Sequence, residues 1–183
     1  MIDLMPYKRI IQHDPDREGN IESSTKSAIQ LDGNSGLASD LGFNANILKK
    51  VDYFRSVDNN VYLIELTNLQ DDIRECIECD ELLKNSAEVR RIVKEVDSKG
   101  LKSVQKKLWM EILEEFKGKW MGSIAAYERL LRKNPVDEDP VYHLVVILKD
   151  DTDIKDRDLL QTTLNNKLVG MTATIDVRLT KEV

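Results

Sequence analysis

The feature that most constrains the fold is a continuous apolar run of strand length, VYHLVVIL at residues 141–148, which follows Pro140. An unbroken run of apolar and β-branched residues is typical of a strand that is covered on both faces. Such a strand needs a neighbour on each side, so we expect it to lie centrally in a sheet. The run therefore indicates a chain built around a central sheet.

The segment after this run completes a strand, helix, strand unit. The acidic stretch DDTDIKDRD supplies capping residues for a helix with leucines at positions 159, 160, 164 and 168, and Gly170 stands at its expected end. Residues 172–179, TATIDVRL, alternate apolar and polar side chains and predict a strand with one solvated face. A unit of this length favours two parallel strands with a right-handed crossover.

Two alternating segments, residues 51–58 and 61–67, lie upstream and are separated by Asn59 and Asn60. Both segments are rich in β-forming residues, and asparagine tolerates the positive φ of a tight turn. The sequence therefore predicts a β-hairpin with Asn59 and Asn60 as its two turn residues.

Apolar residues then recur at helical spacing from residue 89 to residue 131. Gly100 is expected to separate two helices. Gly118 and Gly122 are expected to kink the second helix or to allow a close approach of another backbone segment. These helices are predicted to cover the sheet, with Trp109, Phe116 and Trp120 as core residues rather than a base-stacking platform.

The first 50 residues are the least regular part, with a strand predicted at 27–31 and a helix at 39–49. GNSG in this part lacks the Gly-Lys-Ser/Thr that a nucleotide-binding P-loop requires. A chain of 183 residues suits one domain. We interpret it as a single α/β domain, residues 1–183, with an irregular part at 1–50 and a core at 51–180.

The charge is distributed unevenly along the chain. The net charge is -6, but residues 89–133 hold twelve Lys and Arg against six acids, which leaves +6 there and -12 elsewhere. This segment is either the nucleic-acid contact of the protein or a solvated helix face. The sequence contains no apolar run long enough for a membrane span and no signal-peptide stretch, so we expect a cytoplasmic protein without membrane contact.

Cysteine and histidine are scarce. Cys76 and Cys79 form a CxxC spacing, but a closed zinc site needs four ligands, and His13 and His143 each stand alone. Acidic neighbours do not lower a thiol pKa, so both are interpreted as helix cysteines. His143, in an apolar strand, is expected to be a core or edge histidine with one hydrogen bond rather than a catalytic base.

Two acids near the ends of the predicted hairpin are the candidate site. A turn at Asn59 and Asn60 places Asp52 opposite Thr67 and diagonal to Glu65, with Lys50 on the same face if the strand extends that far. Diagonal neighbours lie about 7 to 8 Å apart, from which two carboxylates can reach one divalent ion. Acids at hairpin ends are also common solvated charges, but Glu65 lies in the apolar segment VYLIELT, where an unpaired carboxylate costs several kcal/mol.

The acids Asp52 in VDYF and Glu65 in IELT, followed by helices, a buried strand, a helix and a last strand, resemble the PD-(D/E)xK nuclease superfamily with its restriction-endonuclease-like fold. The resemblance covers residues 51–180 and implies that Asp52 and Glu65 bind Mg²⁺ or Mn²⁺ for phosphodiester hydrolysis. It also implies a lysine two residues after the glutamate, where this chain has Thr67.

Three interpretations of Thr67 remain open. The lysine has moved elsewhere, with Lys50 the first candidate and Lys106, Lys107, Lys117 and Lys119 as helix alternatives, or catalysis is weak without it, or the fold no longer catalyses. The leading expectation is a metal-dependent nuclease-fold protein that acts on nucleic acid, in restriction, repair or defence against mobile DNA. The alternative is a non-catalytic interaction protein of the same fold, such as an inhibitor or an assembly subunit.

Overall fold

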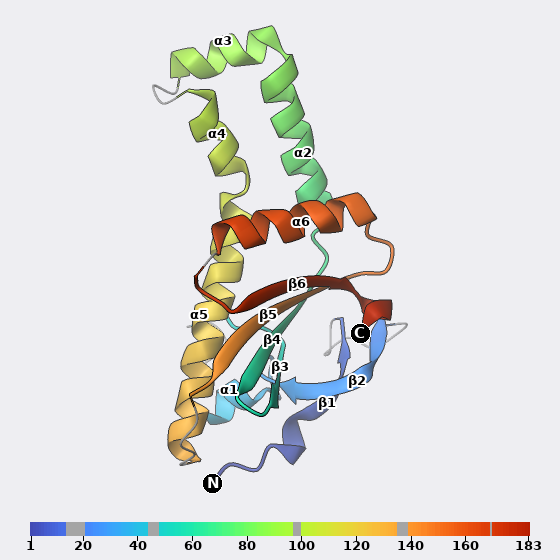
Figure 1. Ribbon diagram of the computed structural model, residues 1–183, viewed down its shortest axis with the longest axis vertical. Helices are drawn as coiled ribbons and strands as arrows, with labels where there is room; N and C mark the ends of the chain where they lie inside the picture. The colour runs from blue at the N-terminus through green and yellow to red at the C-terminus, as the bar shows by residue number, and fades with distance from the viewer. Residues whose placement is uncertain (14–20, 44–47, 97–99, 135–138, 169) are drawn as a thin grey trace.

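A computed structural model describes residues 1–13, 21–43, 48–96, 100–134, 139–168 and 170–183. Within these residues the chain forms one mixed sheet of six strands (Figure 1). The strands lie across the sheet in chain order: β1 (Lys8–Gln12), β2 (Ser23–Gln30), β3 (Tyr53–Val57), β4 (Asn60–Thr67), β5 (Val141–Leu148) and β6 (Thr174–Leu179). The pairs from β1 to β4 are antiparallel, whereas β4, β5 and β6 are parallel. The predicted α/β class with a mixed sheet is confirmed.

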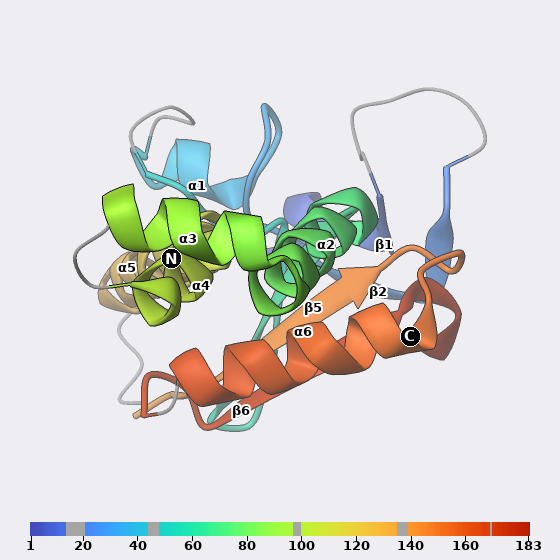
Figure 2. The same ribbon diagram turned by 90° about the horizontal axis from the view of Figure 1, so that it is seen from above.

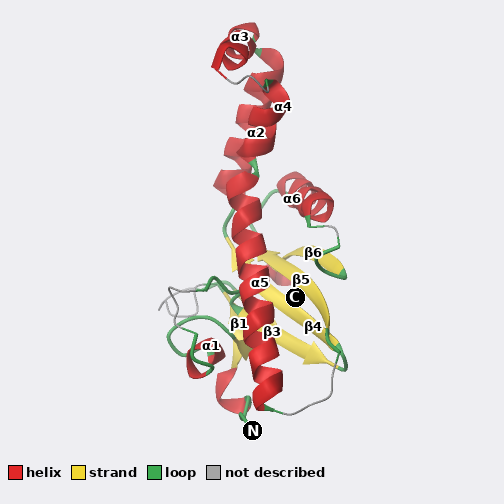
Figure 3. Ribbon diagram, turned by 90° about the vertical axis from the view of Figure 1, so that its left-hand side faces the viewer, coloured by secondary structure: helices red, strands yellow, loops and turns green. Residues whose placement is uncertain are grey.

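The helices of the described residues fall into two groups. The helices that pack on the body are α1 (Leu37–Asp40), α5 (Met110–Lys133) and α6 (Ile154–Lys167), while α2 (Gln70–Asn85), α3 (Ala87–Val96) and α4 (Leu101–Leu108) project from one end as an arm (Figures 1 and 3). Short 3-10 turns are η1 (Met5–Tyr7) and η2 (Thr180–Glu182). No helix in the described part of the chain is long and apolar enough to cross a membrane.

The predicted strand, helix, strand unit is confirmed. β5 spans the apolar run and pairs in parallel with β4 on one side and β6 on the other. Asp153 caps α6 by accepting a hydrogen bond from Lys155 N at 2.8 Å, and Gly170 follows the helix end with a φ of 79°. Among the described residues, helices cover β5 on one sheet face, and the hydrophobic cluster of the other face consists of strand residues and Val183.

The hairpin forms, but its predicted register is wrong by two residues. Tyr53 pairs with Ile64 and Val57 pairs with Asn60, so the turn residues are Asp58 and Asn59. Asp58 takes the positive φ, at 51°, which aspartate tolerates better than most residues. A shift of two leaves every side chain on the face predicted for it, because side chains alternate with a period of two.

The first 50 residues contribute more structure than expected. The strand predicted at 27–31 is part of the longer β2, and β1 pairs with it as the edge strand. The helix predicted at 39–49 is limited to α1 within the described residues, and residues 44–47 lie outside them. Leu31, Leu37 and Leu41 are buried in the main core, so this part packs with the rest of the fold.

The sheet is strongly curved, so that its two ends meet (Figures 1 and 2). His13 Nε2 lies 3.1 Å from Thr180 Oγ1, and Asp150 N donates to Glu22 Oε1 at 2.8 Å. The convex face carries the main core, to which α1, α2, α5 and α6 contribute. The concave face carries a second, smaller cluster built from Ile11, Ala28, Tyr53, Ile64 and Ile147. The fold thus has one helix-covered face and one face without a helix among its described residues.

Candidate functional site

Asp52 and Glu65 lie on the helix-covered face of neighbouring strands, as the sequence predicted. Extending the observed register by one residue beyond the Tyr53–Ile64 pair places Asp52 opposite Glu65 rather than opposite Thr67. Asp52 Oδ2 accepts a hydrogen bond from Leu66 N at 2.8 Å. The two acids are near enough that the charge of Asp52 contributes to a raised pKa at Glu65. The two carboxylates therefore converge on one face of the sheet.

Helix α5 positions the segment that leads to Asp52. Val51 N donates to Ser123 Oγ at 2.8 Å, and Ser123 Oγ donates in turn to Lys119 O at 2.7 Å. A Cβ at Gly122 would lie 2.0 Å from Lys49 O, so only glycine lets the chain pass this close to the helix. The expected close approach of backbone is confirmed at Gly122, and it fixes the chain immediately before the aspartate.

Glu65 is a buried carboxylate with one partner among the described residues. Its side chain is 2% exposed, and Lys119 Nζ donates a short hydrogen bond to Oε1. Within the described residues Oε2 is buried and has no hydrogen-bond partner. Burial first, and the neighbouring charge of Asp52 second, raise the pKa of Glu65 well above its usual value, against the opposing effect of Lys119.

Lys119 is the cation of the site. Its ammonium group contacts Glu65 Oε1 and lies 3.0 Å from Glu115 Oε1. Burial lowers the pKa of this lysine, but the two carboxylates outweigh burial and raise it, so Lys119 stays charged. From the sequence alone, Lys119 is only one of several helix alternatives.

Lys50, the first candidate, has other partners. Its side chain is buried, donates to Leu48 O at 2.6 Å and forms an ion pair with Asp32 Oδ1 at 3.2 Å. The prediction that Lys50 shares the strand face of Asp52 and Glu65 required a strand that extends to Lys50, but β3 begins only at Tyr53. Residues 49–51 follow α5 instead of the sheet alternation, whereas Asp52 still contacts β4 through Leu66 N.

A regular signal in the sequence could have identified Lys119. The buried face of α5 carries residues 112, 116, 123, 126, 127 and 130, which recur at helical spacing. Position 119 completes this series, three residues after Phe116 and four before Ser123. A lysine at a core-facing helix position needs a buried carboxylate partner, and Glu65 was the acid already identified in an apolar strand.

Thr67 lies two residues after Glu65 and helps to line the same small cavity. This cavity, of about 10 Å³, is lined by Glu65, Thr67, Leu69, Ile112, Glu115, Phe116 and Lys119. A volume of about 10 to 15 Å³ holds one water. The site therefore has room beside the carboxylate for a water or a small ion, but not for a phosphodiester without some opening.

The donor set suits a hard divalent ion but is small. Two carboxylates offer the oxygen ligands that Mg²⁺ prefers, and Glu65 Oε2 is an orphaned acceptor among the described residues. Among the described residues no group of three or more His, Cys, Asp and Glu is arranged to hold a metal ion. Mg²⁺ held by one or two carboxylates keeps several waters, which a cavity of about 10 Å³ accommodates only if it opens.

The CxxC pair lies on α2, as expected of helix cysteines. Cys76 Sγ donates to Leu108 O at 3.1 Å, and burial raises the pKa of its thiol. Both thiols border a cavity of about 230 Å³ whose other polar lining residues are acidic: Asp72, Glu75, Glu111 and Glu115. A raised thiol pKa disfavours the thiolate that redox and metal chemistry require.

The basic segment 89–133 does not form one stripe. Lys119 contacts Glu65, Lys117 lies 3.7 Å from Glu114, and Arg129 donates to Leu41 O while it stacks on Phe43. The exposed cations of α3 and α4 are Arg90, Arg91, Lys94, Lys102 and Lys107, and those at the end of α5 are Arg132 and Lys133. Lys99 and the side chain of Lys106 lie outside the described part. Phosphate contacts from this segment are thus expected from α3, α4 and the end of α5 rather than from one continuous stripe.

The remaining candidates have structural roles. His143 makes two contacts instead of the one expected, with Thr174 Oγ1 at 2.8 Å and Asn60 Oδ1 at 3.0 Å. Phe116 is buried, and the two tryptophans are partly buried against the main core, as predicted.

Comparison with known proteins gives no relative: no family model, no curated protein and no solved structure matches this chain. Functional inference therefore starts from the geometry of the site.

Proposed function

We propose that this chain is a metal-dependent phosphodiesterase that acts on nucleic acid, with the nuclease fold that the PD-(D/E)xK resemblance implies. Asp52 and Glu65 are the carboxylates of the site, and Lys119 is its cation. The observation that carries the proposal is the contact of Lys119 with Glu65 Oε1 beside Asp52, because it supplies the positive charge that Thr67 lacks.

The order of elements supports the proposal. Antiparallel strands β3 and β4 present the two acids, α5 presents the lysine, and the parallel strands β5 and β6 follow with α6 between them. This is the order that the resemblance implies for residues 51–180. The difference is that the lysine comes from a helix rather than from the strand that carries the glutamate.

The groups of the chain have distinct roles in such a site. Mg²⁺ or Mn²⁺ held by Asp52 and Glu65 would polarise the phosphodiester and lower the pKa of an attacking water. Lys119 stabilises negative charge that develops on the phosphoryl oxygens. Glu65 Oε2, which has no partner among the described residues, is the atom left for the ion, since Lys119 already holds Oε1.

A second candidate function, a non-catalytic interaction protein, is favoured by one specific observation. Glu65 is 2% exposed, and the cavity beside it measures about 10 Å³. If the chain is such an interaction protein, Lys119 occupies the place of a metal ion beside Glu65. The ion pair between them then stabilises the fold and has no catalytic role.

Metal titration by calorimetry, followed by cleavage assays on plasmid and oligonucleotide substrates with Mg²⁺ or Mn²⁺, tests both candidates. The proposed enzyme binds the ion and cleaves, and Asp52→Asn and Glu65→Gln lose both properties. Lys119→Met is expected to reduce the cleavage rate about a hundredfold or more, because it removes a positive charge that stabilises the transition state. A wild-type protein that neither binds the ions nor cleaves would favour the interaction protein.

Matched controls lie on the same helix. Glu114→Gln and Lys117→Met change the same charges in a surface ion pair and should leave cleavage unchanged. Adding Thr67→Lys to Lys119→Met returns a positive charge to the same small cavity. Recovery of cleavage in this double variant would support the charge role of Lys119, and continued inactivity with intact ion binding would contradict it.

A further inference from the structure

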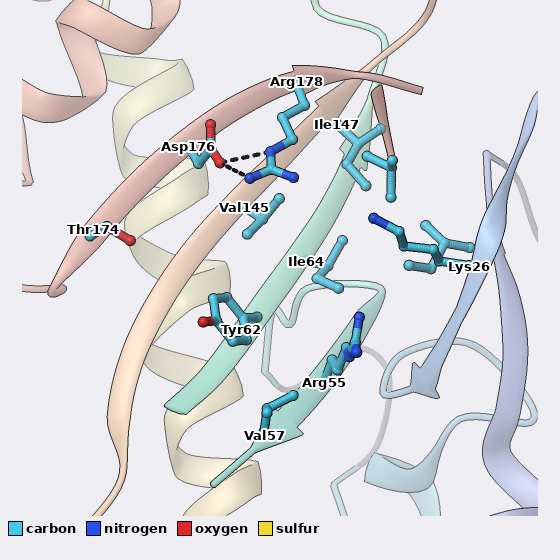
Figure 4. A pocket seen from close by; sticks show the side chains of 12 residues that line it. Lys26, Arg55, Val57, Tyr62, Ile64, Val145, Ile147, Thr174, Asp176 and Arg178 are labelled. Carbon is cyan, nitrogen blue, oxygen red and sulfur yellow. Dashed lines mark hydrogen bonds and ion pairs between the residues drawn. The ribbon is translucent and has the colours of Figure 1, made fainter. Parts of the chain in front are cut away.

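The concave face of the sheet contains a hollow that is lined by residues of β1 to β6 and by Val183. A cavity of about 340 Å³ lies there, and its floor is apolar, formed mainly by Ile64, Val145 and Ile147 from β4 and β5 (Figure 4). Ile11 of β1 and Val183 also line it, where the two ends of the curved sheet meet. Ligand pockets typically measure about 300 to 1,000 Å³ and are mostly apolar with a few polar groups.

Cationic side chains from three different strands surround this floor. Lys26 of β2, Arg55 of β3 and Arg178 of β6 reach towards the same hollow in Figure 4. Asp176 is the acidic side chain of the lining, and it is already paired with Arg178, whose Nε lies 2.7 Å from Oδ2. The lining side chains therefore carry a net charge of +2 in a protein whose net charge is -6.

Two of these cations have no partner within the described part of the chain. Lys26 and Arg55 are exposed, and neither forms an ion pair or donates a side-chain hydrogen bond to another described residue. A guanidinium group binds phosphate through two parallel hydrogen bonds, and an ammonium group adds a point charge. Two such cations from adjacent strands that face one apolar floor are complementary to an anion attached to an apolar body.

An aromatic platform lies beside the floor. The Tyr62 ring stacks on His143 with centroids 4.8 Å apart and planes 20° apart. Hydrogen bonds to Asn60 and Thr174 hold the histidine in place. Tyr62 is thus fixed as part of a flat, apolar wall at one side of the cavity.

We propose that this cavity binds a small phosphate ester of nucleotide size, with the phosphate at Arg55 and Lys26 and the planar group over the apolar floor near Tyr62. The site is independent of the proposed phosphodiesterase site. Side chains alternate along β4, so Tyr62 and Ile64 face the cavity while Glu65 faces α5. A ligand in the cavity is separated from Glu65 by the sheet itself.

Calorimetry and methyl NMR with adenosine 5′-monophosphate as the probe test this site. We expect the probe to shift the methyl signals of Ile64 and Ile147 on the cavity floor. Arg55→Met and Lys26→Met should each weaken binding about tenfold or more, because each removes a charged hydrogen bond to phosphate. Lys155→Met and Arg132→Met remove exposed cations elsewhere and should leave the affinity unchanged. Thermal unfolding of all four variants checks that the fold is intact.

The choice of ligand separates the parts of the proposal. Adenosine lacks the phosphate and inorganic phosphate lacks the apolar body, so both should bind more weakly than the nucleotide. No methyl shifts at Ile64 and Ile147, or equal binding by Arg55→Met and wild type, would overturn the site. A single-stranded oligonucleotide that binds more tightly than the nucleotide and depends on Arg55 would overturn the small-ligand assignment. Glu65→Gln should bind the nucleotide as wild type does, whatever its effect on cleavage.

Discussion

At the residue scale, Glu65 links the candidate site to the stability of the fold. Its pKa in the folded state is raised above the ordinary value of 4.5, mainly by burial. The folded protein therefore holds a proton on Glu65 at pH values where the unfolded chain has released it. Stability falls as the pH rises from about 4.5 towards the folded-state pKa, because the folded state binds more protons than the unfolded state there.

Glu65→Gln should remove this dependence. The amide keeps the oxygen that accepts from Lys119 but cannot ionise, so the free energy of unfolding should fall less steeply as the pH rises above about 4.5. One proton corresponds to a slope of up to about 1.4 kcal/mol per pH unit. Urea unfolding at several pH values measures the slope, with exposed Glu81→Gln as the control. Equal slopes for wild type and Glu65→Gln would show that Glu65 ionises normally in the fold.

Sequence reasoning at this scale identified the acids but not their cation. Asp52 and Glu65 follow from strand alternation, which is a local rule. Lys119 follows only when the buried face of α5 is laid against β4, because its distance from Glu65 along the chain is 54 residues. Lys50 was preferred on the assumption that β3 extends to it, and contact with α5 replaces strand pairing there.

At the element scale, the crossing of residues 48–51 over α5 can be tested with two glycines of the same helix. A Cβ at Gly122 would lie 2.0 Å from Lys49 O, whereas the nearest described contact of a Cβ at Gly118 is Lys49 Cδ at 3.6 Å. Gly122→Ala should therefore destabilise the fold by about 1 to 3 kcal/mol or more. Gly118→Ala should be neutral or stabilise it by up to about 1 kcal/mol, since alanine is the better helix former.

Chemical denaturation of both variants measures the difference. If the crossing also positions Asp52, Gly122→Ala should weaken metal binding beyond its effect on folding, while Gly118→Ala should leave it unchanged. Two alanine variants of equal stability would contradict the close approach.

In the hairpin, the alternation of side chains along a strand predicts which sheet face a residue occupies, but it does not predict the strand register. Alternation predicted the correct face for Asp52 and Glu65 but could not distinguish two registers that differ by two residues. Turn conformation decided between them, with Asp58 rather than Asn60 at the turn. The strand register of this hairpin depends on which of its neighbouring polar residues takes the positive φ. The alternation of hydrophobic and polar residues carries no information on that choice.

At the scale of the whole molecule, the sheet and its crossovers were predictable, but its curvature and the arm were not. The apolar run of β5 and the spacing of α6 and β6 determine a parallel pair from local pattern. The contact of His13 with Thr180, which are 167 positions apart, joins the two ends of the curved sheet, and no local pattern predicts it. Helical spacing alone also does not show that α3 and α4 leave the body instead of covering the sheet (Figure 3).

Helices α3 and α4 of the arm carry exposed cations, whereas α2 is acidic, so nucleic-acid binding should depend on α3 and α4 and on salt. Replacing Arg90, Arg91 and Lys94 of α3 with glutamine removes three positive charges. If these groups bind phosphates, a plot of log affinity against log salt concentration should become less steep, by about one unit of slope for each phosphate that is no longer neutralised.

Replacing Lys8, Lys155 and Lys181 with glutamine is the matched control. It changes the net charge equally at exposed sites outside the arm and should leave the slope nearly unchanged. Fluorescence anisotropy with a labelled duplex from about 50 to 200 mM salt measures both triple variants. An equal decrease in the two would indicate that the total charge, rather than the arm, determines binding, and a wild-type affinity that does not change with salt would favour a protein partner.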